Sequence, residues 1–175
     1  MIKKKGIFMD HKKKAPVTAL AGMTAALYTV LTVFSALFGL SSGAVQCRLS
    51  EALCVLPVFT PASIPGLTVG CFVSNLITGG GLIDGIIGSA ATLIGALGAY
   101  FLRKGKKRCL SPLPTVAANT FLVPLILCVT GGATAGKGYL FFALTVLIGE
   151  TVSAYALGIL LLRLVEKTGI AEKLK

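Results

Sequence analysis

The sequence has few acidic residues, a single histidine and no tryptophan. Asp and Glu together number six among 175 residues, and charged residues of both signs make up only 13% of the chain. A soluble domain carries about twice that share of charge. Hydrophobic residues reach 55%, and the mean hydropathy is +0.88. These proportions predict an all-helical integral membrane protein.

The chain also lacks a recognisable set of metal ligands or catalytic groups. Its only histidine, His11, lies in a basic N-terminal segment, and no nucleophile and base occur at a recognisable spacing. The cysteines are odd in number and contain no CxxC pair; they are Cys47, Cys54, Cys71, Cys109 and Cys128. We therefore expect cysteines that pack as small apolar residues, with no disulfide, no bound metal and no enzymatic activity.

The stretch GGATAGKG at residues 131–138 fits the first seven positions of a phosphate-binding loop. Such a loop needs a Ser or Thr after its lysine to hold magnesium and a strand before it. Here Gly138 follows Lys137, and the preceding segment is predicted to be a helix. We interpret the stretch as a glycine-rich connection between two helices, so the chain is not expected to bind ATP itself.

Charge is absent from long tracts and concentrated in short clusters. Only five charged residues interrupt residues 16–102 and 110–162, namely Arg48, Glu51, Asp84, Lys137 and Glu150. The net charge of +11 comes from the N-terminal tail, the loop RKGKKR at Arg103 to Arg108, and the C-terminal tail. Basic clusters beside apolar spans mark cytoplasmic segments. We therefore assign this charge to topology and expect no nucleic-acid partner.

The turn signals between the clusters predict six spans. They cover residues 17–39, 44–57, 62–78, 82–102, 112–130 and 139–163. The second and third are short for a full crossing, and two re-entrant segments would keep both termini cytoplasmic equally well. We expect one integral membrane domain over residues 1–175, with a basic tail at 1–15, a six-helix bundle at 16–165 and a second tail at 166–175.

Charged residues within spans are expensive, by about 2.5 to 3.5 kcal/mol each on insertion scales, and they mark candidate sites. Arg48 and Glu51 are three residues apart, so we expect them to pair, either structurally or around a ligand. Glu150 lies about 16 Å along its helix, near the middle of the membrane. It either meets a ligand or joins helices as a protonated side chain. Asp84 is equally consistent with a helix cap and a ligand contact.

Three amides and two alanines complete the set of candidates. Gln46, Asn75 and Asn119 are candidate ligand contacts, although interhelical hydrogen bonding is the commoner role of such side chains. Ala21 and Ala25 form part of a ridge of small residues on the first helix, where another helix can approach closely. This ridge either packs within the bundle or docks a further membrane subunit.

The segment GAVQCRLSEALCVLPVFTPASIPGLTVGCFVSN at residues 43–75 resembles the QueT family. These proteins are the substrate-binding (S) components of energy-coupling factor (ECF) transporters assigned to queuosine precursors. The resemblance extends over most of the chain after the N-terminal tail. It is most specific at a polar motif and a proline series, namely Gln46, Arg48, Ser50, Glu51, Pro57, Pro61 and Pro65.

The resemblance implies a six-helix S component that captures a deazaguanine base from outside. It would dock, through Ala21 and Ala25, on a membrane coupling protein with two ATPase subunits that use ATP. Glu51 and Glu150 would accept from the donor edge of the base. The hydrogen-bond acceptors of the base would bind Arg48, Gln46, Asn75 and Asn119. The ring of the base would stack on Phe72, Tyr139 or Phe142. The alternative is a stand-alone secondary transporter with Glu150 as a proton relay.

Overall fold

The computed structural model describes residues 11–40, 47–130 and 138–173, and every regular element in these ranges is helical. The α-helices are α1 (His11–Leu37), α2 (Ser63–Ile77), α3 (Gly81–Phe101), α4 (Leu113–Thr130), α5 (Tyr139–Glu150), α6 (Leu157–Lys167) and α7 (Ile170–Lys173). Two 3-10 helices, η1 (Leu49–Val58) and η2 (Gly105–Leu110), and the π-helical turn η4 (Thr151–Ala156) complete the fold. The predicted all-helical class is confirmed for the described part of the chain.

Four helical stretches are long and apolar enough to cross a membrane. They cover Val17–Leu37, Gly81–Phe101, Lys107–Cys128 and Tyr139–Lys167, and their outward faces carry exposed apolar side chains such as Phe101 and Leu140. The chain is therefore a multi-pass membrane protein. η1 and α2 are apolar but shorter, so the count of six full crossings stays a prediction.

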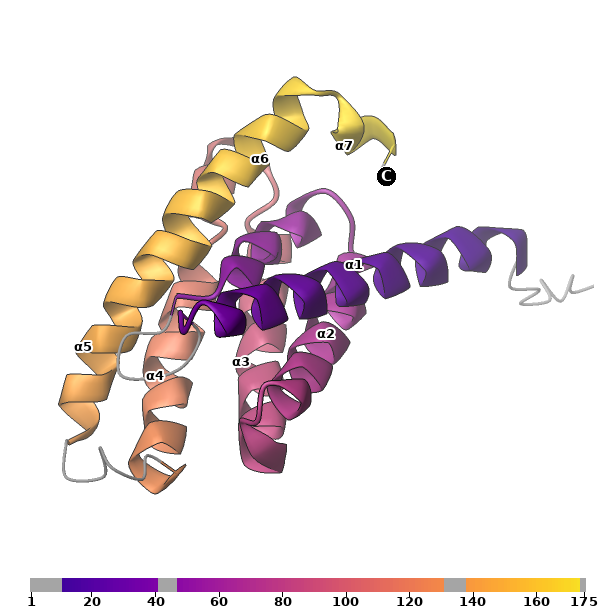
Figure 1. Ribbon diagram of the computed structural model, residues 1–175. Helices are drawn as coiled ribbons and strands as arrows, with labels where there is room; N and C mark the ends of the chain where they lie inside the picture. Colours follow the sequence, from indigo (N-terminus) through magenta and orange to yellow (C-terminus); the bar gives the residue numbers. More distant parts are fainter. Residues whose placement is uncertain (1–10, 41–46, 131–137, 174–175) are drawn as a thin grey trace, which may run out of the picture.

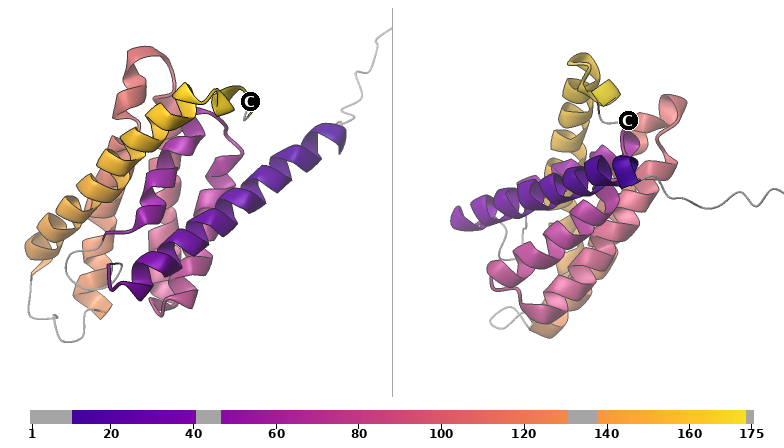
Figure 2. Two further views of the ribbon diagram at one scale, coloured as in Figure 1. Left: turned by 45° about the horizontal axis from the view of Figure 1, so that its top comes forward. Right: turned by 90° about the vertical axis from the view of Figure 1, so that its right-hand side faces the viewer.

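Helices that follow one another along the chain pack side by side, from α1 against α2 through to α4 against α5. Figure 1 shows α3, α4 and the α5–α6 helix running in similar directions, with α1 crossing them at a steep angle. Both views in Figure 2 show the same oblique α1. η1 lies inside this arrangement, in contact with α1, α3 and α6.

η1 is short, tightly wound and almost fully buried. The sequence predicts a helix over residues 44–57, whereas the described helix begins at Leu49 and ends at Val58. Pro57 lies within it and has no N–H to donate to the preceding turn, which disfavours a regular α-helix there. Its apolar side chains fill the core on two sides. Leu53 and Cys54 pack towards α1 and α2, and Val55 and Val58 pack towards α6.

α1 and α2 approach closely because α2 carries glycine at two positions one turn apart. A methyl group on Gly66 would lie 2.4 Å from the Ala21 carbonyl oxygen, and one on Gly70 would lie 2.8 Å from that of Ala25. Only glycine fits such a contact, which is the packing of a GxxxG motif. The ridge of Ala21 and Ala25 therefore contacts α2 in this structure.

The ends of the helical region extend beyond the predicted bundle. α1 begins at His11 rather than at residue 17, because the lysines before the apolar run are themselves good helix formers. α6 ends at Lys167, so the predicted bundle limit at residue 165 falls inside it. Apolar runs locate a membrane span, but they do not show how far a helix continues into water.

Candidate functional site

The charged and amide residues predicted from the sequence gather in one place. Two adjoining cavities share Arg48, Gly88 and Val123 as lining residues. Between them, they are lined by every predicted site residue of the membrane interior that the structure describes: Arg48, Glu51, Asn75, Asp84, Asn119 and Glu150. We call these six residues the polar cluster. Gln46 lies outside the described residues.

Glu51 lies on η1, lines the inner cavity and is only 2% exposed. The Tyr28 hydroxyl of α1 donates a hydrogen bond to its Oε1, and the Cys54 thiol donates to its Oε2 at 3.3 Å. Two further bonds join the same helices. Thr32 donates to the Ser50 hydroxyl at 2.7 Å, and the Leu49 N–H donates to Ser35 at 3.1 Å. Glu51 is therefore fixed from α1.

Arg48 does not form the expected ion pair with Glu51. Among the described residues, the ion pair within 4.0 Å is that of Arg108 with Glu166, at the other end of the bundle. Arg48 caps η1 in an extended conformation, with φ −102° and ψ 113°, so it is outside the helical register that the pairing prediction assumed. Its Nε is buried and has no hydrogen-bond partner within the described part of the chain.

Glu150 ends α5 and is 5% exposed. Asn119 of α4 lines the inner cavity together with it. The Glu150 Oε2 is buried and has no hydrogen-bond partner among the described residues. The π-helical turn η4 begins at the next residue. The wider turn changes the helix phase, so that Glu150 above it and Gly158 below it both face the core.

The second cavity continues from Arg48 towards the start of α3. It is lined by Asn75 of α2 and by Asp84 and Gly88 of α3. Asn75 donates to the Cys71 carbonyl at 3.0 Å, and a methyl group on Gly88 would lie 3.0 Å from the Asn75 amide nitrogen. Gly88 therefore makes room for Asn75. Asp84 is half-buried in the first turn of α3, and no side-chain cap bond is formed there.

Several residues of this region escaped the sequence analysis. Tyr28 carries no charge and lies in a run that predicts only a span, so nothing in its neighbourhood indicated a bond to Glu51. The apolar and small lining residues gave no signal either; they are Cys71, Gly88, Val123, Ile126, Leu127 and Val146. The aromatic candidates Phe72, Tyr139 and Phe142 do not line either cavity.

The cavity between Arg48, Glu51 and Glu150 is small. Its volume is about 10 Å³, which is room for about one water molecule. Arg48 and two buried carboxyl groups leave hydrogen-bonding capacity for a polar guest, because Arg48 Nε and Glu150 Oε2 have no partner among the described residues. The arrangement suits reversible binding of a solute that carries both donors and acceptors.

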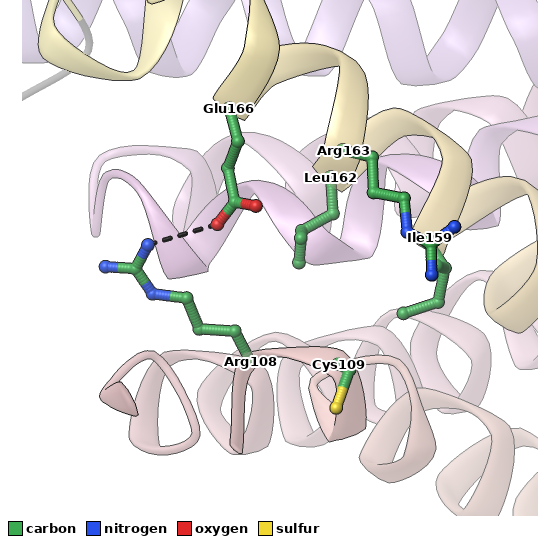
Figure 3. A pocket seen from close by; sticks show the side chains of 6 residues that line it. All are labelled: Arg108, Cys109, Ile159, Leu162, Arg163 and Glu166. Atoms are coloured by element: carbon green, nitrogen blue, oxygen red, sulfur yellow. Dashed lines mark hydrogen bonds and ion pairs between the residues drawn. The ribbon is translucent and has the colours of Figure 1, made fainter. Parts of the chain in front are cut away.

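Two larger recesses lie at the other end of the bundle, beside the basic loop after α3. Figure 3 shows one of about 430 Å³, in which Arg108 and Glu166 meet at 3.1 Å across the space between η2 and α6. None of the polar cluster lines it. We therefore place the candidate site at the smaller, buried cavities.

Two comparisons with known proteins give a match. The family model described as QueT transporter matches residues 18–167, which include the whole polar cluster. The curated Queuosine precursor transporter QueT of Lactococcus lactis subsp. cremoris (strain MG1363) is 34% identical over 86 residues. The match covers 49% of this chain and 50% of that relative, so it spans about half the length of the relative. No solved structure matches the chain.

The family match and the fold lead to one assignment. The matched region extends from the first turns of the α1 span to the end of α6 and takes in all four long apolar stretches. The charged residues of the membrane interior that it contains line two cavities. The chain belongs to the QueT transporter family, a family of transporters rather than of enzymes.

Proposed function

We propose that this chain is the substrate-binding subunit of an ECF importer and that it captures a deazaguanine precursor of queuosine from outside the cell. The observation that carries the proposal is the polar cluster. Arg48 and Glu150 each have a buried atom with no hydrogen-bond partner among the described residues, in a chain where charged residues within spans are few. Such groups are retained in a membrane interior where a ligand uses them.

A deazaguanine matches the chemistry of this cluster. Its aminopyrimidine edge presents N–H donors that a carboxylate accepts as a pair, and its carbonyl and ring nitrogen accept from Arg or an amide. Glu150 and Glu51 are the proposed acceptors for that edge or for an ammonium group on the base. Arg48, Asn75 and Asn119 are the proposed donors, and Asp84 lies at the outer entrance. Gln46 is proposed for the same role from the sequence.

The small volume of the cavity implies that capture moves helices. A site for a compound of drug-like size measures about 300 to 1,000 Å³, and the space between Arg48 and Glu150 holds about one water molecule. The helices around it must therefore separate when the base enters. η1 is held by side-chain bonds to α1, so the separation is expected between η1 and the pair α4 and α5.

The proposed partners are a membrane coupling protein and two ATPases, which would supply ATP hydrolysis. Ala21 and Ala25 match the docking signature on the first helix, although their backbone contacts α2 here. The small residues of α1 that are exposed beside them are Ala19, Gly22 and Ala26. We propose this exposed face of α1 as the part of the ridge that meets the coupling protein. We also propose that the chain has six spans and that both of its termini are cytoplasmic.

The test is a calorimetric titration of the purified chain with the nitrile and aminomethyl forms of the base. We expect Glu150→Gln to weaken binding of the cationic aminomethyl form about 10- to 100-fold, because a hydrogen-bonded charge pair is lost. The neutral nitrile form should lose less. The control is Glu166→Gln, which removes an exposed carboxylate near the end of the same continuous helix. Wild-type protein that binds neither form would refute the proposal.

A second measurement separates the proposal from a proton-coupled carrier. Proteoliposomes that contain the chain alone should accumulate no base under a pH gradient. Accumulation should begin when the coupling protein, the ATPases and ATP are added. Uptake by the chain alone that follows the pH gradient would instead establish Glu150 as a proton relay.

A further inference from the structure

A basic recess lies at the end of the bundle remote from Asp84 and has no part in the proposed capture of a base. Its volume is about 550 Å³, and its charged lining residues are Arg103, Lys104 and Arg108. Among the residues that the structure describes, no acidic side chain lines it. The opposite wall is formed by residues at and just beyond the end of η1, including Pro57 and Phe59. Three cations therefore face a recess with an apolar floor.

The cations are held in place by the fold. The Arg103 guanidinium lies 3.7 Å from the centre of the Tyr100 ring, and its backbone carbonyl accepts from Arg108 Nε at 2.7 Å. Arg108 also donates to Glu166 at 3.1 Å. Stacking on an aromatic ring fixes a guanidinium while leaving its edge N–H groups available to an anion. Lys104 is exposed and adds a mobile charge.

The recess adjoins the ends of two apolar stretches, where the headgroups of a surrounding bilayer are expected. It lies between the end of the apolar stretch Gly81–Phe101 and the start of the stretch Lys107–Cys128. Phe101, beside Arg103, is 77% exposed, and Leu110 and Leu113 at the start of the next helix are 41% and 45% exposed. Exposed apolar side chains of a spanning helix contact acyl chains. Basic and apolar side chains therefore lie next to each other here, as the headgroup and acyl chains do in a phospholipid.

We infer that this recess binds the headgroup of an anionic phospholipid, with the phosphate between Arg103, Lys104 and Arg108 and the acyl chains against Phe101. Phosphate oxygens accept several hydrogen bonds from Arg, and basic pockets beside spans bind anionic headgroups in this way. A bound lipid would join the α3–η2 corner to the end of η1. Since η1 begins at the polar cluster, the lipid would stabilise the element that carries Glu51.

The experiment is native mass spectrometry of the full-length chain released from detergent, with phosphatidylglycerol or phosphatidylcholine of the same acyl chains. We expect phosphatidylglycerol to be retained on the order of tenfold better. The double variant Arg103→Gln and Lys104→Gln should retain both lipids equally. Arg163→Gln is the matched control, because it removes a cation that lines the neighbouring recess and not this one.

Two further measurements on the wild-type protein test the inference if the double variant folds poorly. With wild-type protein, retention of phosphatidylglycerol should fall steeply between low and high salt. Soluble glycerol phosphate should compete poorly, because it lacks the acyl chains that contact Phe101. Equal retention of the two lipids by the wild type, unchanged retention by a folded double variant, or full displacement by glycerol phosphate would each overturn the inference.

Discussion

Glu51 of η1 both lines a cavity and forms a hydrogen bond with α1. It lines the inner cavity with Arg48 and Glu150, and both of its oxygens already accept hydrogen bonds from Tyr28 and Cys54. A ligand that approaches Glu51 therefore meets a carboxyl group whose position is set from α1. The sequence indicated Glu51 through its charge, whereas Tyr28 is a neutral residue in an apolar run. Charge is visible in a sequence, but the partner that orients it depends on how helices pack.

We predict that Tyr28→Phe weakens ligand binding on the order of tenfold, because Glu51 loses its donor from α1 and can rotate. Calorimetric titration with the base measures this change. Thr32→Val is the matched control, since Thr32 lies one turn along the same face and bonds Ser50 instead. An unchanged affinity in Tyr28→Phe, with the control also unchanged, would show that Tyr28 does not position Glu51 for the ligand.

At the scale of elements, η1 and the α1–α2 contact show what periodicity predicts and what it misses. Charge-poor runs and the turn signals between them located the described helices of the membrane interior to within a few residues, because a span requires such a run. They did not show that η1 is a buried 3-10 helix, since its winding depends on Pro57 and on neighbours from α1, α3 and α6. The glycines of α2 were likewise overlooked, because their partners Ala21 and Ala25 lie on another helix.

Gly66→Ala should destabilise the bundle by about 1 to 3 kcal/mol, because the added methyl group would force α1 and α2 apart. The free energy of unfolding in a detergent titration measures the loss. The control is Gly22→Ala on α1, where an added methyl group meets no described atom within 4 Å. That variant should be neutral or slightly more stable, since alanine favours a helix over glycine. Equal effects in the two variants would contradict the close α1–α2 packing.

At the scale of the whole molecule, charged residues occupy different levels along the bundle. Arg103, Lys104, Arg108 and Glu166 lie at one end of the bundle, while Asp84 lies near the start of α3 at the other and Glu150 lies between. The positive-inside bias predicts that the basic end is cytoplasmic. The sequence analysis proposed seven polar residues as ligand contacts because they are too polar to face lipid, and the six that the structure describes line the two adjoining cavities. Which of their atoms meet could not be read from the sequence, because it depends on the helix phase at η4 and the extended backbone at Arg48.

The predicted orientation can be checked with a pair of cysteine probes. Gly138→Cys, at the exposed start of α5, should react with a membrane-impermeant maleimide added to intact cells. Lys104→Cys, at the basic end, should react only after the cells are made permeable. The parent chain, labelled in parallel, gives the background from native cysteines. The reverse labelling pattern would show that the basic end faces outward, which would contradict the predicted orientation and capture of the base from outside.

The narrowness of the space between Arg48 and Glu150 has a consequence for the cell as a whole. A cavity that admits about one water, as the described residues line it, is not by itself a path for protons or sodium ions across the membrane. Copies that wait without partners would then leave the electrochemical gradient intact. Under the proposed function, a cell would hold more copies of this substrate-binding subunit than of the coupling protein, and each free copy would stay closed to ions until a ligand binds.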